Sequence, residues 1–561
     1  MRHQLSNSLV PLILFFTLEM GKTQAQELTN PQAEIEKIFA EIETKDGPGG
    51  SGVIWHHGRN VYQTYKGLAS GDPKTSIGSE SLFNIGNLSD HFVAFAVLQL
   101  AHEGELSLSQ SVEAYLPLKN SLFSSITVKH LLSHSSGLHD VSRVLAISGK
   151  SDTNQSEILQ LIQKQGKLGF EPGTEFAINR TNLFLLEIIV ESVTGEAYTA
   201  YLENHIFPQA SLKNTTYKPD VINSQVAKSY NVEENAFYAI PGQGDRLTPR
   251  LYSTVEDLLQ WELFLKIIKI RKPSLYEQLH EVAQLNDGKL FNWPEGKLTL
   301  GQQFKNSERG MAELYQVGSY QGFASSIFKF PEEDFLSIIL TNNGMEYSGY
   351  FGIRTAYLLM DESFPKPASI DFNGLQTLTL SNKSLQTYEG QYWDMQGELV
   401  RKIETVNDTL RYTRSADNSS PLIPIEKDLF LMMFPGDEEV KVKFNTESKP
   451  KEMYFVIEEA DPIRFEIFEP VKGLSKEKEL NGNYKNELMN ASFRVAVDDE
   501  SLLLIRNGQD TLTYSAVTNR LFANGPWYMP SITFTKNNKG QVTGFVANNA
   551  GIKNLTFEKE E

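Results

Sequence analysis

The sequence predicts an α+β domain followed by two smaller all-β domains. Within residues 26–362, strand-like patterns at both ends enclose long apolar runs at helical spacing, such as Phe92–His102 and Leu183–Val193. This arrangement is typical of an α+β domain. Beyond residue 376 the helical periodicity disappears, and turn residues separate short alternating runs such as Val440–Phe444. Repeated short strands of this kind favour antiparallel barrels or sandwiches.

Two hairpins are predicted in the first domain because pairs of apolar runs flank polar turns. The flanking runs and the turns between them are Val53–Ile54 and Val61–Tyr65 around His57–Asn60, and Phe323–Phe330 and Phe335–Leu340 around Pro331–Asp334. Two prolines then fall between Glu362 and Asp371. We therefore expect a linker over residues 363–375.

A weak internal repeat runs through the all-β region. Leu385–Tyr392 resembles Glu479–Tyr484, and each is followed by alternating strands at similar intervals. The later matching positions are Leu429–Phe430 with Leu521–Phe522, Val440–Phe444 with Ile532–Phe534, and Phe465–Phe468 with Leu555–Phe557. The repeat predicts two barrels, over residues 376–471 and 472–561. The alternative is that unrelated β domains share such patterns.

The first 25 residues are expected to be a secretory signal peptide. Arg2 and His3 precede an apolar run from Leu9 to Leu18, and Ala25 closes a small-residue cleavage site. The alternative is an uncleaved anchor, but the apolar run is about half of the roughly 20 residues that a spanning helix needs. We expect a secreted or periplasmic protein with no stable membrane insertion after cleavage.

Composition excludes several classes of function. The chain has 561 residues, a net charge of −18 and no cysteine, so disulfides and thiolate chemistry are excluded. No basic stripe is present, and nucleic acid is therefore not an expected partner. His130 and His134 lie four residues apart, but no metal-binding or phosphate-binding motif accompanies them. We expect no metal and no cofactor.

Seven short stretches of the first domain occur in a recognisable order. They are Pro48–Gly50, Phe83–Asp90, Leu98–Leu108, Ile126–Leu138, Pro172–Phe176, Tyr252–Leu258 and Gly318–Phe323. Together they resemble the serine β-lactamase-related family, which includes class C β-lactamases, DD-peptidases, D-aminopeptidases and esterases. The resemblance implies an antiparallel sheet flanked by helices, plus a helical part. The all-β region resembles, more loosely, the paired lipocalin-like barrels of family D-aminopeptidases.

The resemblance also implies a mechanism that these residues do not support. The family forms an acyl-enzyme with a Ser nucleophile, a Lys three residues later, a Tyr from a second motif and a Lys-Thr-Gly or His-x-Gly motif on the edge strand. Intact neighbouring residues fix the matching positions in this chain. These degenerate positions are Asn87 for the Ser, Asp90 for the Lys, Ile178 and Arg180 in the second motif, and Gln316 and Gly318 in the third.

None of the replacements keeps the chemistry of the group that it replaces. An amide at Asn87 is a poor nucleophile, Asp90 lacks the positive charge of Lys, and an alkyl group at Ile178 relays no proton. Ser89 is the nearest hydroxyl, but in a helix it points about 200° away from position 87. A working pair of Ser89 with His91 is therefore not expected.

Asp90 and Arg180 are expected to form an ion pair. In the family the matching Lys and Asn lie side by side, and here the two positions carry opposite charges. Either charge alone would be costly to bury, whereas together they form a charge-assisted hydrogen bond. The alternative is that the two substitutions arose independently and that Arg180 faces solvent.

Three functional hypotheses follow. The first is an exported pseudoenzyme that binds a peptide, a cell-wall fragment or a protein partner. Its binding positions would be Asn87, Arg180, Gln316 and Ser319. The second is an active hydrolase of amides or esters with an unorthodox nucleophile. The third is a structural or interaction module in which the barrels matter and the first domain is inert.

Overall fold

A computed structural model describes residues 31–560 with internal gaps. The gaps are 43–46, 119, 151–153, 218–224, 234–235, 240–250, 294–295, 309, 345–347, 361–362, 364–376, 395–399, 416–417, 433–439, 458–461, 470, 472, 490, 499–500, 507–509, 524 and 550. The expected signal peptide lies outside the described residues, and so does all but the first residue of the expected linker.

A seven-stranded antiparallel sheet organises the first domain, with strand order β2-β1-β13-β12-β11-β10-β9. Its strands are β1 Gly50–His56, β2 Arg59–Lys66, β9 Lys297–Leu298, β10 Phe304–Glu308, β11 Met311–Tyr320, β12 Phe323–Phe330 and β13 Phe335–Thr341. Both predicted hairpins are present, as β1–β2 and β12–β13. The first turn is tighter than predicted, because pairing resumes at His56 with Arg59.

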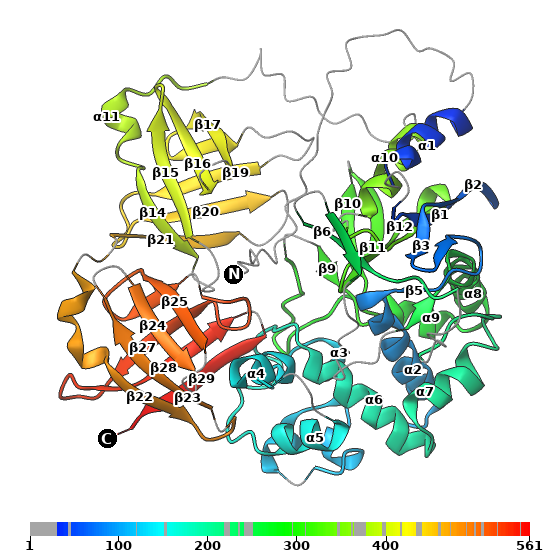
Figure 1. Ribbon diagram of the computed structural model, residues 1–561, viewed down its shortest axis with the longest axis horizontal. Helices are drawn as coiled ribbons and strands as arrows, with labels where there is room; N and C mark the ends of the chain where they lie inside the picture. Colours follow the sequence, from blue (N-terminus) through cyan, green and yellow to red (C-terminus); the bar gives the residue numbers. More distant parts are fainter. Residues whose placement is uncertain are drawn as a thin grey trace.

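Helices cover both faces of this sheet (Figure 1). On one face, α1 (Pro31–Phe39) and α10 (Gly349–Met360) pack on alternate residues of β13, including Phe335 and Ile339. The intervening residues of β13 belong to the larger core of the helical side. This alternation follows from the period of two along a strand.

The helical part lies on the other face of the sheet. Its helices are α2 Ser89–Glu103, α3 Val128–Leu132, α4 Val141–Ser148, α5 Gln155–Gln163, α6 Arg180–Thr194, α7 Tyr198–Tyr201, α8 Val255–Arg271 and α9 Pro273–Leu279. The predicted apolar helices are confirmed as α2 and α6. Because ten consecutive residues of α2, from His91 to Leu100, are buried, this helix is enclosed by the core on every side.

Three two-stranded ribbons complete the domain. They are β3 (Leu68–Gly71) with β4 (Lys74–Ser76), β5 (Phe83–Asn84) with β8 (Tyr252–Ser253), and β6 (Tyr230–Glu233) with β7 (Ala236–Ala239). The β5–β8 ribbon is the one that matters for the site, because α2 follows β5 after only four residues.

Two closed eight-stranded barrels follow, as the sequence predicts. The first contains β14 Gly390–Asp394, β15 Val400–Val406, β16 Thr409–Ser415, β17 Asn418–Glu426, β18 Leu429–Met432, β19 Val440–Asn445, β20 Glu452–Ile457 and β21 Ile463–Phe468. The second contains β22 Gly482–Asn486, β23 Ala491–Val497, β24 Ser501–Arg506, β25 Asp510–Ala516, β26 Leu521–Ala523, β27 Ser531–Lys536, β28 Val542–Asn549 and β29 Ile552–Lys559.

Equivalent aromatic residues build the two barrel cores. The hydroxyl of Tyr392 donates a hydrogen bond of 2.8 Å to the carbonyl of Tyr388, four residues earlier, and Tyr484 donates one of 2.8 Å to Leu480 in the same way. The repeat positions Phe430, Phe444 and Phe465 are buried in the first core, and Phe522, Phe534 and Phe557 in the second. The repeat predicted from sequence is therefore a structural one.

The second barrel lies against the first domain beside α4 (Figure 1). Val144 and Ile147 of α4 belong to the same apolar cluster as the core of that barrel. A guanidinium nitrogen of Arg506 donates to the carbonyl of Ile147 at 3.2 Å, and the amide of Asn554 donates to the carbonyl of Gly169 at 2.8 Å. The barrel thus covers an apolar helix face that would otherwise meet water.

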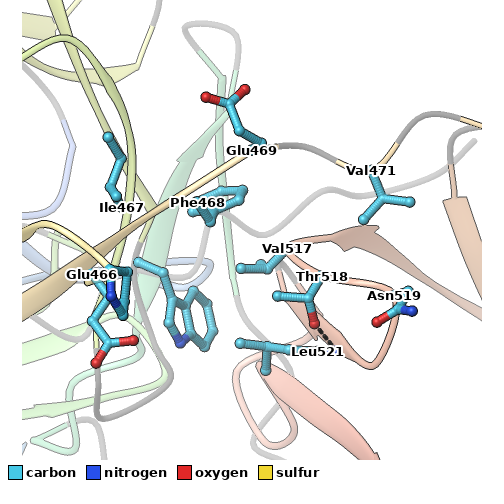
Figure 2. A pocket seen from close by; sticks show the side chains of 11 residues that line it. Glu466, Ile467, Phe468, Glu469, Val471, Val517, Thr518, Asn519 and Leu521 are labelled. Atoms are coloured by element: carbon cyan, nitrogen blue, oxygen red, sulfur yellow. Dashed lines mark hydrogen bonds between the residues drawn. The ribbon is translucent and has the colours of Figure 1, made fainter.

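A solvent-open pocket of about 430 Å³ lies between β21 of the first barrel and the β25–β26 turn of the second. Figure 2 shows Phe468, Val517 and Leu521 around it. Trp393 and Val517 are buried in the small apolar cluster that joins the barrels. No residue that the sequence assigned to the candidate site lines this pocket, so it is separate from that site.

Candidate functional site

Two glycines bring the start of α2 against β11. Gly86, at φ +53°, begins the short 3₁₀ helix η2 (Gly86–Leu88) that leads into α2. A Cβ on Gly86 would lie 2.9 Å from the amide nitrogen of Ser319, and a Cβ on Gly318 would lie 2.9 Å from the amide nitrogen of Asn87. These two backbones meet only because both positions lack a side chain.

Arg180 is fixed at the start of α6 by its neighbours. Asn179 caps the helix, accepting a hydrogen bond of 3.1 Å from the amide of Asn182. The buried carboxylate of Asp140 accepts the backbone N–H of Arg180 at 2.9 Å. Asp140 is also the N-cap of α4, so one carboxylate links the starts of two helices and sets the direction of the Arg180 side chain.

The guanidinium of Arg180 binds two of the degenerate positions at once. Its Nη1 donates to both carboxylate oxygens of Asp90, at 3.1 and 3.2 Å, and its Nη2 donates to the side-chain oxygen of Asn87. The predicted ion pair is confirmed. The pair is less deeply buried than expected, because the Arg180 and Asp90 side chains keep 21% and 15% exposure.

Gln316 ties β11 to the position of the missing nucleophile. Its side-chain amide donates to the backbone carbonyl of Asn87 at 3.0 Å, and the residue is 4% exposed. A neutral amide, committed to the backbone of η2, thus stands where the family places a Lys or His. Val317 and Ser319 lie on the opposite face of the strand from Gln316, and both are exposed.

The structure therefore brings the predicted positions together, with one exception in detail. Asn87, Asp90, Arg180, Gln316 and Gly318 are joined by the contacts above. The side chain of Ile178 packs against the main core instead. Its backbone lies close to the second barrel, because a Cβ added to Gly551 would be 3.2 Å from the carbonyl oxygen of Ile178.

The edge-strand expectation needs a correction. β11 is not the edge of the sheet, since β10 pairs with it from Met311 to Tyr315. Beyond Tyr315, only β12 pairs with β11 among the described strands. On its other side the stretch 316–320 faces η2, where Gly86 approaches the backbone of Ser319.

Ser89 and His91 are committed to the backbone and do not form a catalytic pair. Ser89 is 3% exposed, and its hydroxyl accepts the amide of Leu251 at 3.1 Å. His91 Nδ1 donates to the carbonyl of Gly301 at 2.6 Å, and burial lowers the pKa of His91 to about 4. The expectation that Ser89 is no substitute nucleophile agrees with these contacts.

His130 and His134 have structural partners. Nε2 of His134 donates to Gln302 at 2.8 Å, and its Nδ1 accepts the amides of Asn179 and Asn182 at 3.3 and 3.1 Å. Burial lowers the pKa of His134. His130 closes the capping box at the start of α3. Both rings hold loops in place beneath the site.

The residues that support Arg180 are not among the positions predicted from sequence. Asp140 could have been found as an N-cap, because an acidic residue stands directly before the apolar run of α4. The second barrel also borders the site here: the amide of Asp140 donates to the carbonyl of Gly551 at 3.0 Å, and the guanidinium of Arg143 lies over the ring of Trp527.

Comparison with known proteins agrees with this architecture. Residues 35–351, more than half of the chain, match the Beta-lactamase family. The chain therefore belongs to the β-lactamase family, whose active members act through serine.

Its relatives are distant. Protein flp of Staphylococcus aureus (strain MW2) is 25% identical over 334 residues, and the match covers 57% of this chain but only 65% of that protein. Penicillin-binding protein 4* of Bacillus subtilis (strain 168) is 22% identical over 466 residues, covering 78% of this chain and 97% of that protein. The octameric penicillin-binding protein homologue from Pyrococcus abyssi has the same fold, with a TM-score of 0.52 and 20% identity, over 77% of this chain and 98% of that one.

Among the described helices, none combines the length and apolar character that crossing a bilayer requires.

Proposed function

We propose that this chain is a non-catalytic, exported member of the β-lactamase family that binds a peptide, a cell-wall fragment or a protein partner at the altered site. The observation that supports this most strongly is the contact of Arg180 with both Asn87 and Asp90. These are the positions that the family gives to its nucleophile and to the lysine that activates it.

The chemistry of these groups argues against acyl transfer. A covalent mechanism needs a nucleophile and a base that takes its proton. The Asn87 amide is not such a nucleophile, and a guanidinium group has no lone pair with which to act as a base. The Asp90 carboxylate is held by that guanidinium. A salt bridge therefore fills the place where the catalytic lysine would act.

Side chains beside the salt bridge remain available to a peptide segment. Val317 and Ser319 are exposed on β11 next to η2. Arg180, still 21% exposed, can bind a carboxylate of the incoming segment. Charge of both signs within one site favours a zwitterionic or peptide ligand.

Export is supported by the apolar segment Leu9–Leu18 and the small residues ending at Ala25. Expression of the full chain with its own N-terminus, followed by N-terminal sequencing of the exported product, tests it. We expect a new N-terminus at Gln26. A product retained in the cell with Met1 intact would contradict export.

The binding proposal is tested by thermal shift of the mature chain against peptides and cell-wall fragments, since a ligand that binds the native state raises its melting temperature. We expect a hit whose shift is lost in Arg180→Ala, which removes the guanidinium that contacts Asn87 and Asp90. Hits that are unaffected by this change, while the fold is intact by circular dichroism, would place binding elsewhere.

The active-hydrolase alternative would require turnover of an amide or ester by the purified chain. The scaffold alternative would require partner capture that survives loss of the Arg180 side chain. Both outcomes are distinguishable from the proposal in the same preparations.

A further inference from the structure

Two turns meet at the end of the sheet that lies away from the candidate site. The β1–β2 turn carries His56 and His57, and the β12–β13 turn carries Glu333. β1 pairs with β13, so that Trp55 is opposite Leu336. A ring nitrogen from each histidine and a carboxylate oxygen of Glu333 lie within 4.8 Å of one another.

The backbone of the first turn places both rings on one side. Neighbouring residues of a strand normally point to opposite faces, but His57 adopts a left-handed conformation at φ +48°. The two imidazole rings are consequently stacked, with centroids 3.9 Å apart. Within the described part of the chain, the buried Nε2 of His56 makes no hydrogen bond.

Asp334 holds the two turns in register and leaves Glu333 to face the histidines. Its carboxylate accepts the amide of Gly58 at 2.7 Å and the indole N–H of Trp55 at 3.4 Å, and it pairs with Lys266. The three groups of the cluster are thus brought together by contacts that do not use their own ligand atoms. Such preorganisation is what a metal site needs from its surroundings.

An imidazole binds a metal ion through the lone pair of its neutral ring. Burial is the largest cause that lowers the pKa of His56, and it favours this neutral form.

We propose that His56, His57 and Glu333 form a binding site for a divalent transition metal ion, with Zn²⁺ as the preferred ion. Two imidazole nitrogens and one carboxylate oxygen are a ligand set that Zn²⁺ takes, with water in the fourth position. Mg²⁺ and Ca²⁺ prefer sets made of oxygen alone.

The site is independent of the altered catalytic site. The strand register sets Ser51 level with Leu340, Ser325 and Gly318, and His56 lies five residues further along β1. At about 3.3 Å per residue that is roughly 16 Å. A metal ion here would clamp two hairpin turns together and would not take part in ligand binding at Arg180.

The test is calorimetric titration of the EDTA-treated full chain with ZnCl₂, together with its melting temperature with and without the ion. We expect one Zn²⁺ per chain, a rise in melting temperature, and no response to MgCl₂. His57→Asn, which tolerates the left-handed turn, and Glu333→Gln should each weaken binding by at least about tenfold.

A matched control is His205→Ala, which removes the exposed histidine paired with Glu196 and should leave Zn²⁺ binding unchanged. The proposal would be overturned if the wild-type chain bound no Zn²⁺ at about 100 µM, a concentration above the Kd of most preformed zinc sites. Equal binding by wild type, His57→Asn and Glu333→Gln would overturn it too, because it would mean an adventitious ion only.

Discussion

Arg180 holds both carboxylate oxygens of Asp90 with one guanidinium nitrogen and holds Asn87 with the other. Relative to the family arrangement, the positive charge has moved from the first turn of α2 to the first residue of α6. The pair is close to neutral in sum, so the site keeps no unpaired charge at the position of the family lysine.

The Asp90–Arg180 pair should contribute measurably to stability. Asp90→Ala and Arg180→Ala should each lower the free energy of unfolding by about 1–3 kcal/mol, less than for a fully buried pair because both side chains are partly exposed. A double-mutant cycle in urea measures the coupling, which we expect to be favourable. Asp90→Lys with Arg180→Asn should be better tolerated than Asp90→Lys alone, and a coupling of zero would contradict the pairing.

Ser89 should act on stability and not on reactivity. Ser89→Ala removes the acceptor for the buried amide of Leu251 and should cost about 1–3 kcal/mol, as for other unsatisfied buried N–H groups. Chemical denaturation measures this. Ser319→Ala, at an exposed position, is the control and should leave the free energy of unfolding nearly unchanged. A larger loss of stability in Ser319→Ala than in Ser89→Ala would contradict the structural role of Ser89.

The first domain should lose stability in mild acid. Burial lowers the folded-state pKa of His91 and of His139 to about 4, below the unfolded value of about 6.5. The unfolded chain therefore binds more protons between these values, and stability falls as the pH drops from about 6.5 to about 4, by up to about 3 kcal/mol for each histidine.

Urea unfolding at pH 7 and pH 5 measures this loss. His139→Gln should reduce the pH dependence, because it removes one of the buried imidazoles whose pKa is lowered. Replacement of the exposed His205 is the control and should leave the slope as it is. A stability that is constant from pH 7 to pH 5 would show that neither ring is held neutral.

The second barrel should stabilise α4. Arg506→Ala removes hydrogen bonds to the carbonyls of Ala146 and Ile147 and should speed hydrogen exchange of the α4 amides. Arg494→Ala, which changes an exposed arginine of the same barrel, should have no such effect. Equal exchange in both variants would mean that the barrel does not support the helix.

This contact also limits how the scaffold alternative can be tested. Deletion of residues 363–561 would expose Val144 and Ile147, which lie in the core cluster of the barrel. A truncated chain could then capture proteins through these apolar side chains. Partner capture is better compared between the full chain and its Arg506→Ala variant.

Part of the site could be predicted from sequence because its backbone is set by intact neighbours. Phe83 and Phe92 are both buried beside η2, which fixes Asn87 and Asp90 between them. Opposite charges at positions 90 and 180 then predict their pairing. Long apolar periodicity likewise predicts α2 and α6.

Other features depend on geometry that the sequence does not express. The apolar residues Val144 and Ile147 have the spacing of an ordinary core face of a helix. That spacing does not indicate that they pack against a barrel more than 300 residues further along the chain. The approach of His57 to Glu333 depends on one left-handed residue and on the pairing of β1 with β13.

The absence of an activated nucleophile is tested by intact-mass spectrometry of the mature chain after incubation with a fluorophosphonate and, separately, with a labelled β-lactam. Both reagents add covalently only where a nucleophile is activated. We expect an unchanged mass in each case, with an active class C β-lactamase labelled to completion under the same conditions. A stoichiometric adduct on this chain, lost in Asn87→Ala or in Ser89→Ala, would show that the site still carries an activated nucleophile.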